Sequence, residues 1–237
     1  MRLVLMALVA APHLYGQHLL VPMDDNQRNH LKAYGLTYSA LQRTEKAEWL
    51  LNYRGGAFLL LDTPATRRRA GLDGVSVTPL DDAAIAALRT EMAGGNMDAV
   101  PLERAPKVAI YSPPNANPWD DAVTIALDYA GIPYTKVWDP EVMAGDLTKY
   151  EWLHLHHEDF TGQYNKFYIS YRGSPWFINQ VTRTIGTAKQ LGFNNVPTLK
   201  KAVADKMRTY VENGGFLFAM CGATETLLVD RAIAAVL

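Results

Sequence analysis

The sequence predicts an α/β protein made of two Rossmann-like or flavodoxin-like halves, each built on a parallel sheet. Apolar runs of strand length alternate with longer segments of helical period, which is typical of βαβ units. A polar stretch with two prolines, 96–106, interrupts this alternation, and the pattern restarts cleanly at Lys107. We therefore expect an N-terminal α/β domain over 17–100, a linker, and a second domain over 106–237.

The first half contains four apolar runs and two helical patterns. We expect strands at 18–23, 47–53, 57–61 and 75–78. The first expected helix covers 24–43, with Asp24 or Asp25 as its N-cap, and the second covers 81–95 with a double-glycine stop. A turn at 54–56 separates the second and third strands.

The second half repeats the strand–helix alternation more regularly. We expect strands at 107–111, 134–138, 151–157 and 216–220, and helices at 120–130, 141–149, 198–212 and from 224 onward. An aromatic and polar insertion, 160–197, precedes the third of these helices. Right-handed crossovers then give a flavodoxin-like order 2-1-3-4, open for a fifth strand. Because the sequence stops inside an apolar helix, at "AIAAVL", we expect it to be a C-terminally truncated fragment.

Composition and charge exclude few classes of function. The chain has 237 residues, of which 49% are hydrophobic and 20% charged, and its formal net charge is -1. This balance gives no general electrostatic reason to bind nucleic acid or an anionic membrane. The basic cluster at 67–69 is expected to be a solvated helix face or loop.

The N-terminus has the layout of a secretory signal peptide over 1–16. Arg2 precedes an apolar run, Leu3–Ala11, and small and turn-forming residues follow. The run is too short for a permanent transmembrane anchor, so we expect a periplasmic or secreted protein. The alternative is a buried first strand, although "HLLVPM" directly afterwards already has that pattern.

The single cysteine, Cys221, lies between an apolar strand and a helical segment. At such a position backbone N–H groups and the helix dipole stabilise a thiolate. Gly222 allows a tight turn, and the N–H groups of Gly222 and Ala223 are candidates for an oxyanion hole. The alternative is a buried free cysteine that packs as a small hydrophobe.

The stretch "AMCGA" after a flavodoxin-like strand resembles the nucleophile elbow of the class I glutamine amidotransferase-like superfamily. The resemblance covers about 107–237 and implies that Cys221 is the nucleophile. Active members also carry a histidine and a glutamate downstream of the cysteine, whereas this chain has no histidine after His157. Their glycine-rich oxyanion loop corresponds here to "HHEDFTGQ". Either the downstream partners lie in a missing segment, or the chain is a member without amidotransferase activity.

The densest group of ionisable residues is "HLHHED", at the end of the third strand of the second half. On a strand, His154, His156 and Glu158 point to one face, and His157 and Asp159 point to the other. The expected strand order places this end beside the cysteine turn, at the carboxyl edge where open α/β sheets bind ligands.

Three interpretations of this group remain open. His156 or His157 is a candidate base for the cysteine, oriented by Glu158 or Asp159. His154, His156 and Glu158 are alternatively a zinc site, because two imidazoles and a carboxylate suit that metal. The third interpretation is a polar strand end that anchors the insertion and needs no cofactor.

The insertion "GQYNKFYISYRGSPWFINQ" places aromatic rings among polar side chains. Such rings suit a sugar, a peptide or another small ligand, and a long loop above a sheet edge is often a lid. The candidate ligand-binding residues are Tyr164, Tyr171, Arg172 and Trp176. The alternative is a lid that packs on its own aromatic residues.

Four stretches, "HLLVPMDDNQRNHLKAYGLTYSAL", "EWLLNYRGGAFLL", "WLHLHHEDFTGQYNKFY" and "GGFLFAMCGATET", together resemble exported bacterial proteins often labelled asparagine synthetase B. This resemblance spans essentially the whole mature chain and implies an extracytoplasmic location. The activity in the label is not carried over, because residue 2 is Arg rather than an N-terminal cysteine and no serine-glycine-rich ATP loop occurs.

We therefore expect an exported, amidotransferase-like protein that acts as a cysteine-dependent hydrolase on an amide or a related small ligand. The alternatives are a non-catalytic module that binds a carbohydrate or peptide, and a metal-dependent hydrolase that uses the histidine strand.

Overall fold

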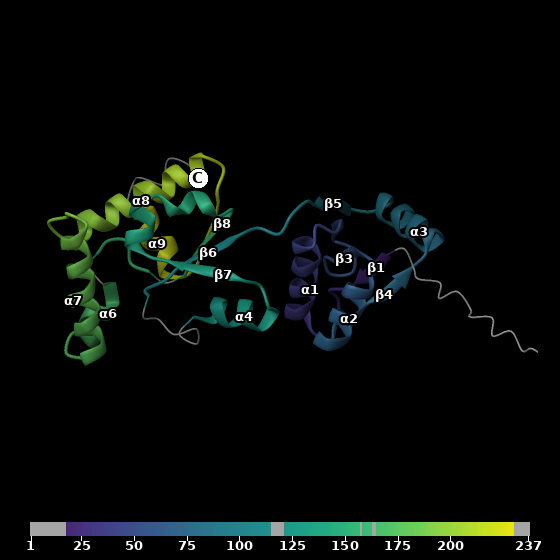
Figure 1. Cartoon of the computed structure of the whole chain (residues 1–237), viewed down its shortest axis with the longest axis horizontal. Helices are drawn as coiled ribbons and strands as arrows, with labels where there is room; N and C mark the ends of the chain where they lie inside the picture. The colour runs from purple at the N-terminus through teal and green to yellow at the C-terminus, as the bar shows by residue number, and fades with distance from the viewer. Residues whose placement is uncertain (1–17, 115–120, 157, 163–164, 230–237) are drawn as a thin grey trace, which may run out of the picture. The chain divides into compact units, whose positions relative to one another are not determined.

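The computed structural model of this chain describes residues 18–114, 121–156, 158–162 and 165–229. The predicted signal peptide, 1–16, lies outside these residues. The chain divides into two compact units, each with its own sheet: residues up to Ala105 together with Tyr129–Gly131 form the first, and the remaining residues from Pro106 onward form the second (Figure 1). None of the helices that the described residues form is long and apolar enough to cross a membrane.

The first unit contains a five-stranded sheet of order β4-β1-β3-β2-β5. All four of its strand pairs are antiparallel, so the predicted parallel sheet of the first half is wrong. Its elements are β1 (His18–Val21), α1 (His30–Gln42), β2 (Ala47–Leu51), β3 (Phe58–Leu61), α2 (Pro64–Asp73), β4 (Thr78–Leu80), α3 (Asp82–Ala93) and β5 (Asp98–Leu102).

The order and directions of β1 to β4 are those of a ferredoxin-like β-α-β-β-α-β arrangement. β3 lies between β1 and β2, and β1 lies between β3 and β4, so each helical crossover skips one strand. The strand β5 extends the sheet beyond β2, inside the stretch that was predicted to be a linker.

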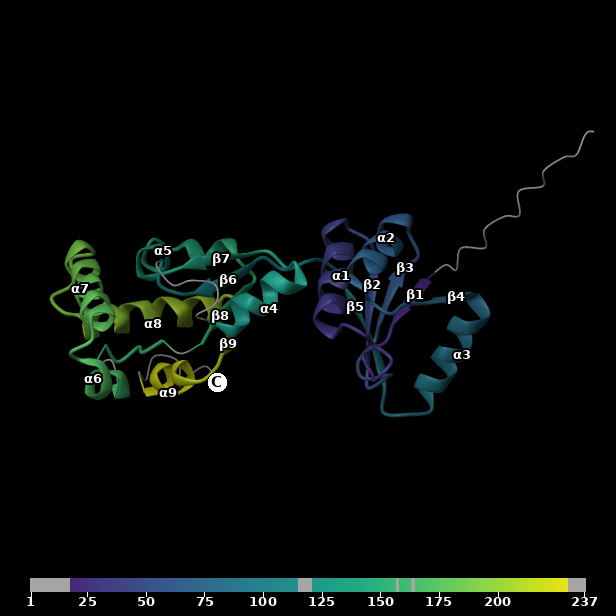
Figure 2. The ribbon, with the colours of Figure 1, turned by 90° about the horizontal axis from the view of Figure 1, so that it is seen from below.

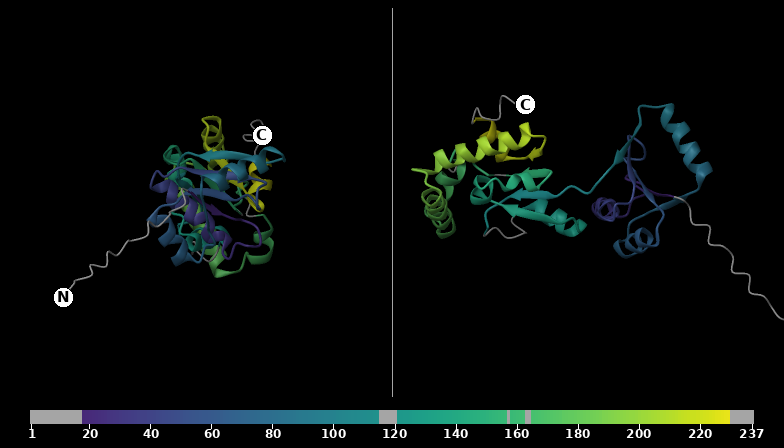
Figure 3. Two further views of the ribbon diagram at one scale, coloured as in Figure 1. Left: turned by 90° about the vertical axis from the view of Figure 1, so that its right-hand side faces the viewer. Right: turned by 45° about the horizontal axis from the view of Figure 1, so that its top comes forward.

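One physical feature makes this sheet antiparallel, and a second explains why the sequence resembles that of a parallel sheet. Only a short turn joins β2 to β3, and a short turn joins antiparallel strands. Both faces of the sheet are also covered: α1 and α2 pack on one face and α3 on the other (Figures 2 and 3). The strands β1 and β3 are therefore apolar on both faces, which is the pattern that usually indicates a parallel sheet.

The first helix also begins later than expected. Its N-cap is Asn29, whose Oδ1 accepts a hydrogen bond from the N–H of Lys32 at 3.2 Å. Asp24, one of the two predicted caps, forms an ion pair with Arg54 at 2.8 Å instead. This pair joins the end of β1 to the turn between β2 and β3.

The second unit contains a parallel four-stranded sheet of order β7-β6-β8-β9, which confirms the predicted order 2-1-3-4 (Figures 1 and 2). Its strands are β6 (Val108–Tyr111), β7 (Tyr134–Val137), β8 (Trp152–Leu155) and β9 (Phe216–Ala219). Its helices are α4 (Ala122–Ala130), α5 (Asp139–Met143), the 3₁₀ helix η2 (Asp146–Lys149), α6 (Asn165–Tyr171), α7 (Pro175–Gln190), α8 (Val196–Glu212) and α9 (Gly222–Val229). The helices α6 and α7 form within the predicted insertion.

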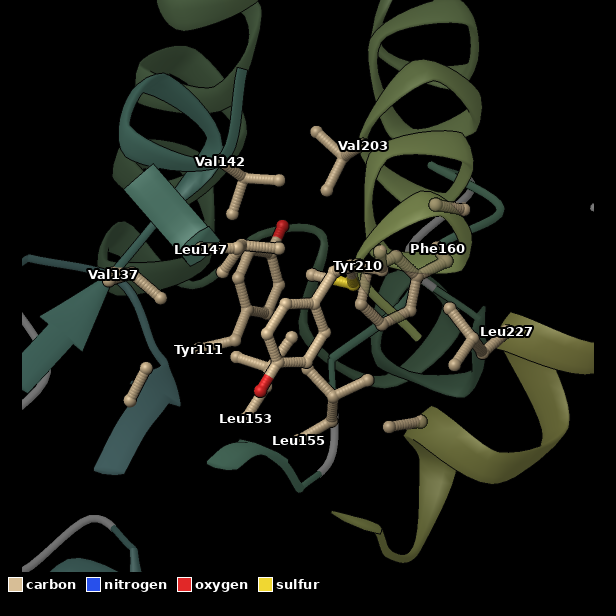
Figure 4. Packing of buried hydrophobic residues seen from close by; sticks show 14 of the residues in the cluster. Tyr111, Val137, Val142, Leu147, Leu153, Leu155, Phe160, Val203, Tyr210 and Leu227 are labelled. Atoms are coloured by element: carbon tan, nitrogen blue, oxygen red, sulfur yellow. The ribbon is translucent and has the colours of Figure 1, made fainter. Parts of the chain in front are cut away.

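One face of the parallel sheet carries the core of this unit. Leu153 and Leu155 of β8 are fully buried and contribute to this core. The core brings the sheet together with α5, α8 and α9 (Figure 4). Because side chains alternate along a strand, His154 points to the opposite face, where its ring lies 5.7 Å from the ring of Phe218.

Candidate functional site

Cys221 occupies the turn between β9 and α9. Its φ angle is 49°, in the left-handed region that residues other than glycine rarely adopt, and its side chain is exposed. The strand ends at Ala219 and the helix begins at Gly222, so the predicted strand–turn–helix sequence is confirmed. A strained turn of this kind presents a nucleophile at the edge of a sheet in α/β hydrolases.

Backbone hydrogen bonds tie this turn to the end of β8. The N–H of Met220 donates to the carbonyl of Leu155 at 3.0 Å. The N–H of Ala223 lies 3.2 Å from the carbonyl oxygens of both His156 and Met220. Of the two predicted oxyanion donors, Ala223 is thus already engaged, whereas the N–H of Gly222 has no backbone acceptor among the described residues.

The imidazole of His156 is paired with Asp121. Its Nδ1 lies 3.1 Å from Oδ1 of Asp121, which is buried and also accepts a hydrogen bond from the N–H of Val123 at 2.8 Å. Glu158 and Asp159 were the predicted orienting residues, and a role of either toward this imidazole stays a prediction. A carboxylate beside Nδ1 holds an imidazole in the orientation and tautomer that a general base needs.

Asp121 was not among the predicted site residues. It lies at the start of α4, and its carbonyl accepts the N–H of Ile125 at 3.2 Å. The signal that could have found it is topological. β6 and β8 are neighbours in the predicted order, so the residues that follow them meet at one edge of the sheet.

Glu158 accepts a hydrogen bond from the backbone N–H of His156 at 2.9 Å through Oε2. Burial raises the pKa of this carboxyl from 4.5 to about 7, and the charge of Asp121 adds to the increase. The backbone hydrogen bonds and the charge of Lys200 oppose it. Glu158 is therefore a carboxyl group that exchanges its proton near neutral pH.

His154 is buried, and neither of its ring nitrogens has a hydrogen-bond partner among the described residues. Burial lowers its pKa. No three His, Cys, Asp or Glu side chains of the described residues are grouped to hold a metal ion, so His154, His156 and Glu158 do not form the proposed zinc ligand set. His157 lies outside the described residues.

A cavity of about 180 Å³ opens between the carboxyl end of the parallel sheet and α7. Its lining consists of Pro113, Trp138, Glu158, Asp159, Gly162, Trp176, Phe177, Gln180, Thr184, Val196 and Lys200. Trp176 is the one predicted ligand-binding residue in this lining. Tyr171 packs against its ring at 5.2 Å, Arg172 is not among the lining residues described, and Tyr164 lies outside the described residues.

Lys200, which lines this cavity, belongs to a buried polar network. The Nζ of Lys200 lies 2.8 Å from the hydroxyl of Tyr111 and 2.9 and 3.0 Å from the two carboxylate oxygens of Asp139. The hydroxyl of Tyr111 in turn donates to Asp139. The ammonium also lies 4.1 Å from the ring centroid of Trp138, within cation–π range.

No protein-family model, curated protein or solved structure matches this chain. The assignment of function therefore depends on the geometry of the second unit.

Proposed function

We propose that the second unit is a cysteine-dependent hydrolase that acts on an amide or a related small acyl compound. Cys221 is the nucleophile, His156 is the general base, and Asp121 orients the imidazole. The observation that carries the proposal is the exposed, left-handed Cys221 turn, hydrogen-bonded to the residue that carries the His156–Asp121 pair.

The proposed reaction follows the usual chemistry of a cysteine nucleophile. The thiol of Cys221 transfers its proton to His156, and the sulfur attacks the amide carbonyl carbon. The C–N bond breaks, and the imidazolium returns the proton to the leaving amine. Water then attacks the thioester, which releases the carboxylic acid and restores the thiol. The N–H of Gly222 is the candidate donor to the oxyanion.

Reactivity of the thiol is the first test of the proposal. Treatment with iodoacetamide at neutral pH, followed by intact-mass analysis, should show fast single alkylation of the native protein and none in Cys221→Ser. His156→Gln should slow the reaction, while His30→Gln, in the first unit, should react like the wild type. A thiol that reacts no faster than free cysteine would contradict its role as an activated nucleophile.

Turnover is the second test, with release of ammonia from primary amides such as glutamine and asparagine as the assay. Cys221→Ser should abolish turnover, and His156→Gln should reduce kcat by about 10²- to 10⁴-fold, the usual contribution of a general base. Asp121→Asn should also reduce kcat, because the imidazole loses the carboxylate that orients it. Wild-type turnover by His156→Gln would exclude the proposed base.

Two further elements of the proposal depend on the sequence. The pattern of residues 1–16 supports an extracytoplasmic location, and the resemblance of "AMCGA" supports an amidotransferase-like reaction. An inert thiol and no turnover, together with retained ligand binding, would instead favour a non-catalytic binding module.

A further inference from the structure

The cavity beside α7 has a lining that is chemically distinct from the cysteine turn. Cys221 is not among the described residues that line it. Its apolar walls include Trp138, Trp176 and the buried Phe177. An apolar cavity of about 150 Å³ holds a benzene molecule. A space of about 180 Å³ therefore accommodates one ring with a short polar arm.

The acidic groups in the lining retain capacity to accept hydrogen bonds. Asp159 receives two bonds at Oδ1, from the N–H of Thr161 at 2.8 Å and its hydroxyl at 2.6 Å. Its other oxygen, Oδ2, is buried and has no partner among the described residues. A buried carboxylate oxygen without a partner is costly, because its desolvation is not compensated. A ligand that donates a hydrogen bond would remove this cost.

The second acidic group is Glu158, whose side chain is more than nine-tenths buried. Its Oε2 accepts the N–H of His156, and the carboxyl group contributes to the cavity wall. Two acidic side chains that follow each other in the chain therefore line one small space. The charge of Asp159 favours a cationic group, which would be held by charge-assisted hydrogen bonds and would in turn favour the ionised form of Glu158.

Lys200 also lines this cavity, and its charge partly offsets the charges of the two acidic groups. Its three N–H donors are matched by three acceptors, the hydroxyl of Tyr111 and both carboxylate oxygens of Asp139. Asp139 also balances its charge. The lining thus presents one unused acceptor, Oδ2 of Asp159, and the N–H donors of Lys200 are already used by Tyr111 and Asp139.

We propose that this cavity binds a small organic amine with an apolar ring. The ammonium donates to Asp159 and Glu158, and the ring packs against Trp138, Trp176 and Phe177. An aromatic wall suits such a ligand because an ammonium is attracted to ring faces as well as to carboxylates. A carboxylate of the same shape is repelled by Asp159 and has no hydrogen to donate to Oδ2 of that residue.

Calorimetric titration of the full chain at neutral pH tests the ligand class without any mutation. The probes are benzylamine, its neutral analogue benzyl alcohol and the anion benzoate, which share one ring. Benzylamine should bind saturably, benzyl alcohol about ten- to hundredfold more weakly, and benzoate not at all. Equal binding of benzylamine and benzyl alcohol, or no saturable binding of benzylamine, would overturn the proposal.

Variants locate the site. Asp159→Asn should weaken benzylamine binding about ten- to hundredfold. Asp205→Asn, an equal charge change at an exposed position of α8, should leave binding unchanged. If Asp159→Asn does not fold, Trp176→Ala at the exposed rim should weaken benzylamine binding at least tenfold. Wild-type affinity in the folded Asp159 or Trp176 variant would place the amine elsewhere. Cys221→Ser should bind normally, which separates this site from the proposed catalysis.

Discussion

Glu158 should make the second unit less stable as the pH rises, which is the opposite of the usual effect of a carboxyl group in a folded protein. Its folded-state pKa is raised from 4.5 to about 7, chiefly by burial. Between these two values the folded state holds a proton that the unfolded state has lost. The contribution of Glu158 to stability is therefore fully present below about 4.5 and is lost as the pH rises through about 7.

The magnitude follows from the size of the pKa difference. One pKa unit corresponds to about 1.4 kcal/mol, so the full shift corresponds to about 3 kcal/mol. Most of this, about 2–3 kcal/mol, is lost between about pH 5 and about pH 8. The neighbouring charged groups, Asp121 and Lys200, oppose each other and do not reverse the sign.

The substitution Glu158→Gln isolates this effect. Glutamine has nearly the same shape, and its carbonyl oxygen can still accept the N–H of His156, but it does not ionise. Urea denaturation of both proteins at about pH 5 and about pH 8 should show the variant gaining about 2–3 kcal/mol relative to the wild type. Other titrating groups cancel in this difference. A stability difference that does not change with pH would refute the burial of an ionisable Glu158.

Two further substitutions test the buried polar groups of this unit. Lys200→Met should destabilise the unit by about 3–5 kcal/mol, because it leaves Asp139 buried without its counter-charge. The double variant, Lys200→Met with Asp139→Leu, should recover much of that loss, because no unpaired charge is left buried. An equal loss in the single and double variants, measured by urea denaturation, would argue against the ion pair. His154→Phe should raise the free energy of unfolding by about 1 kcal/mol or more, because two buried nitrogens without partners are removed. Since burial lowers the pKa of His154, that advantage should grow below about pH 6.5, and a thermal melt with a lower Tm than the wild type would contradict it.

The fold of the second unit was predictable because its signals are local. Strand-length apolar runs alternate with helices, and handed crossovers then specify the order β7-β6-β8-β9. In the first unit, the strands β1 and β3 are apolar on both faces because helices cover both sides of their sheet. Hydropathy alone does not distinguish this case from a parallel sheet, and the deciding signal was the short β2–β3 turn.

The boundary of the first unit depends on pairing that the sequence pattern does not show. β5 begins with an aspartate, carries a proline and lies within a longer polar stretch, so the sequence predicts a linker there. It becomes a strand because it pairs with β2 along five residues, from Ala47↔Leu102 to Leu51↔Asp98. An edge strand tolerates the proline, which lacks an N–H, because one side of the strand has no partner.

In the candidate site, too, some residues can be proposed from the sequence around them, and others are found only from contacts between distant parts of the chain. Cys221, His156 and Glu158 could be proposed as site residues from the sequence around them, since each follows an apolar strand. Asp121 and Lys200 were missed, because the first reaches the site from α4 and the second from α8. Their roles depend on distances across the sheet, to His156 and to Asp139, rather than on spacing along the chain.

The strand order brings the residues of the candidate site to one edge of the parallel sheet. Asp121 lies in the crossover that follows β6, His156 follows β8, and Cys221 follows β9, and these three strands are consecutive in the sheet. The hydrogen bond from the N–H of Ala223 to the carbonyl of His156 joins the last two. A change at the end of β8 is therefore expected to shift His156, the proposed base, and the cysteine turn together. The loss of the Asp121 carboxylate, in contrast, releases the imidazole alone and leaves the turn in place, so Asp121→Asn should lower turnover without changing the exposure of Cys221.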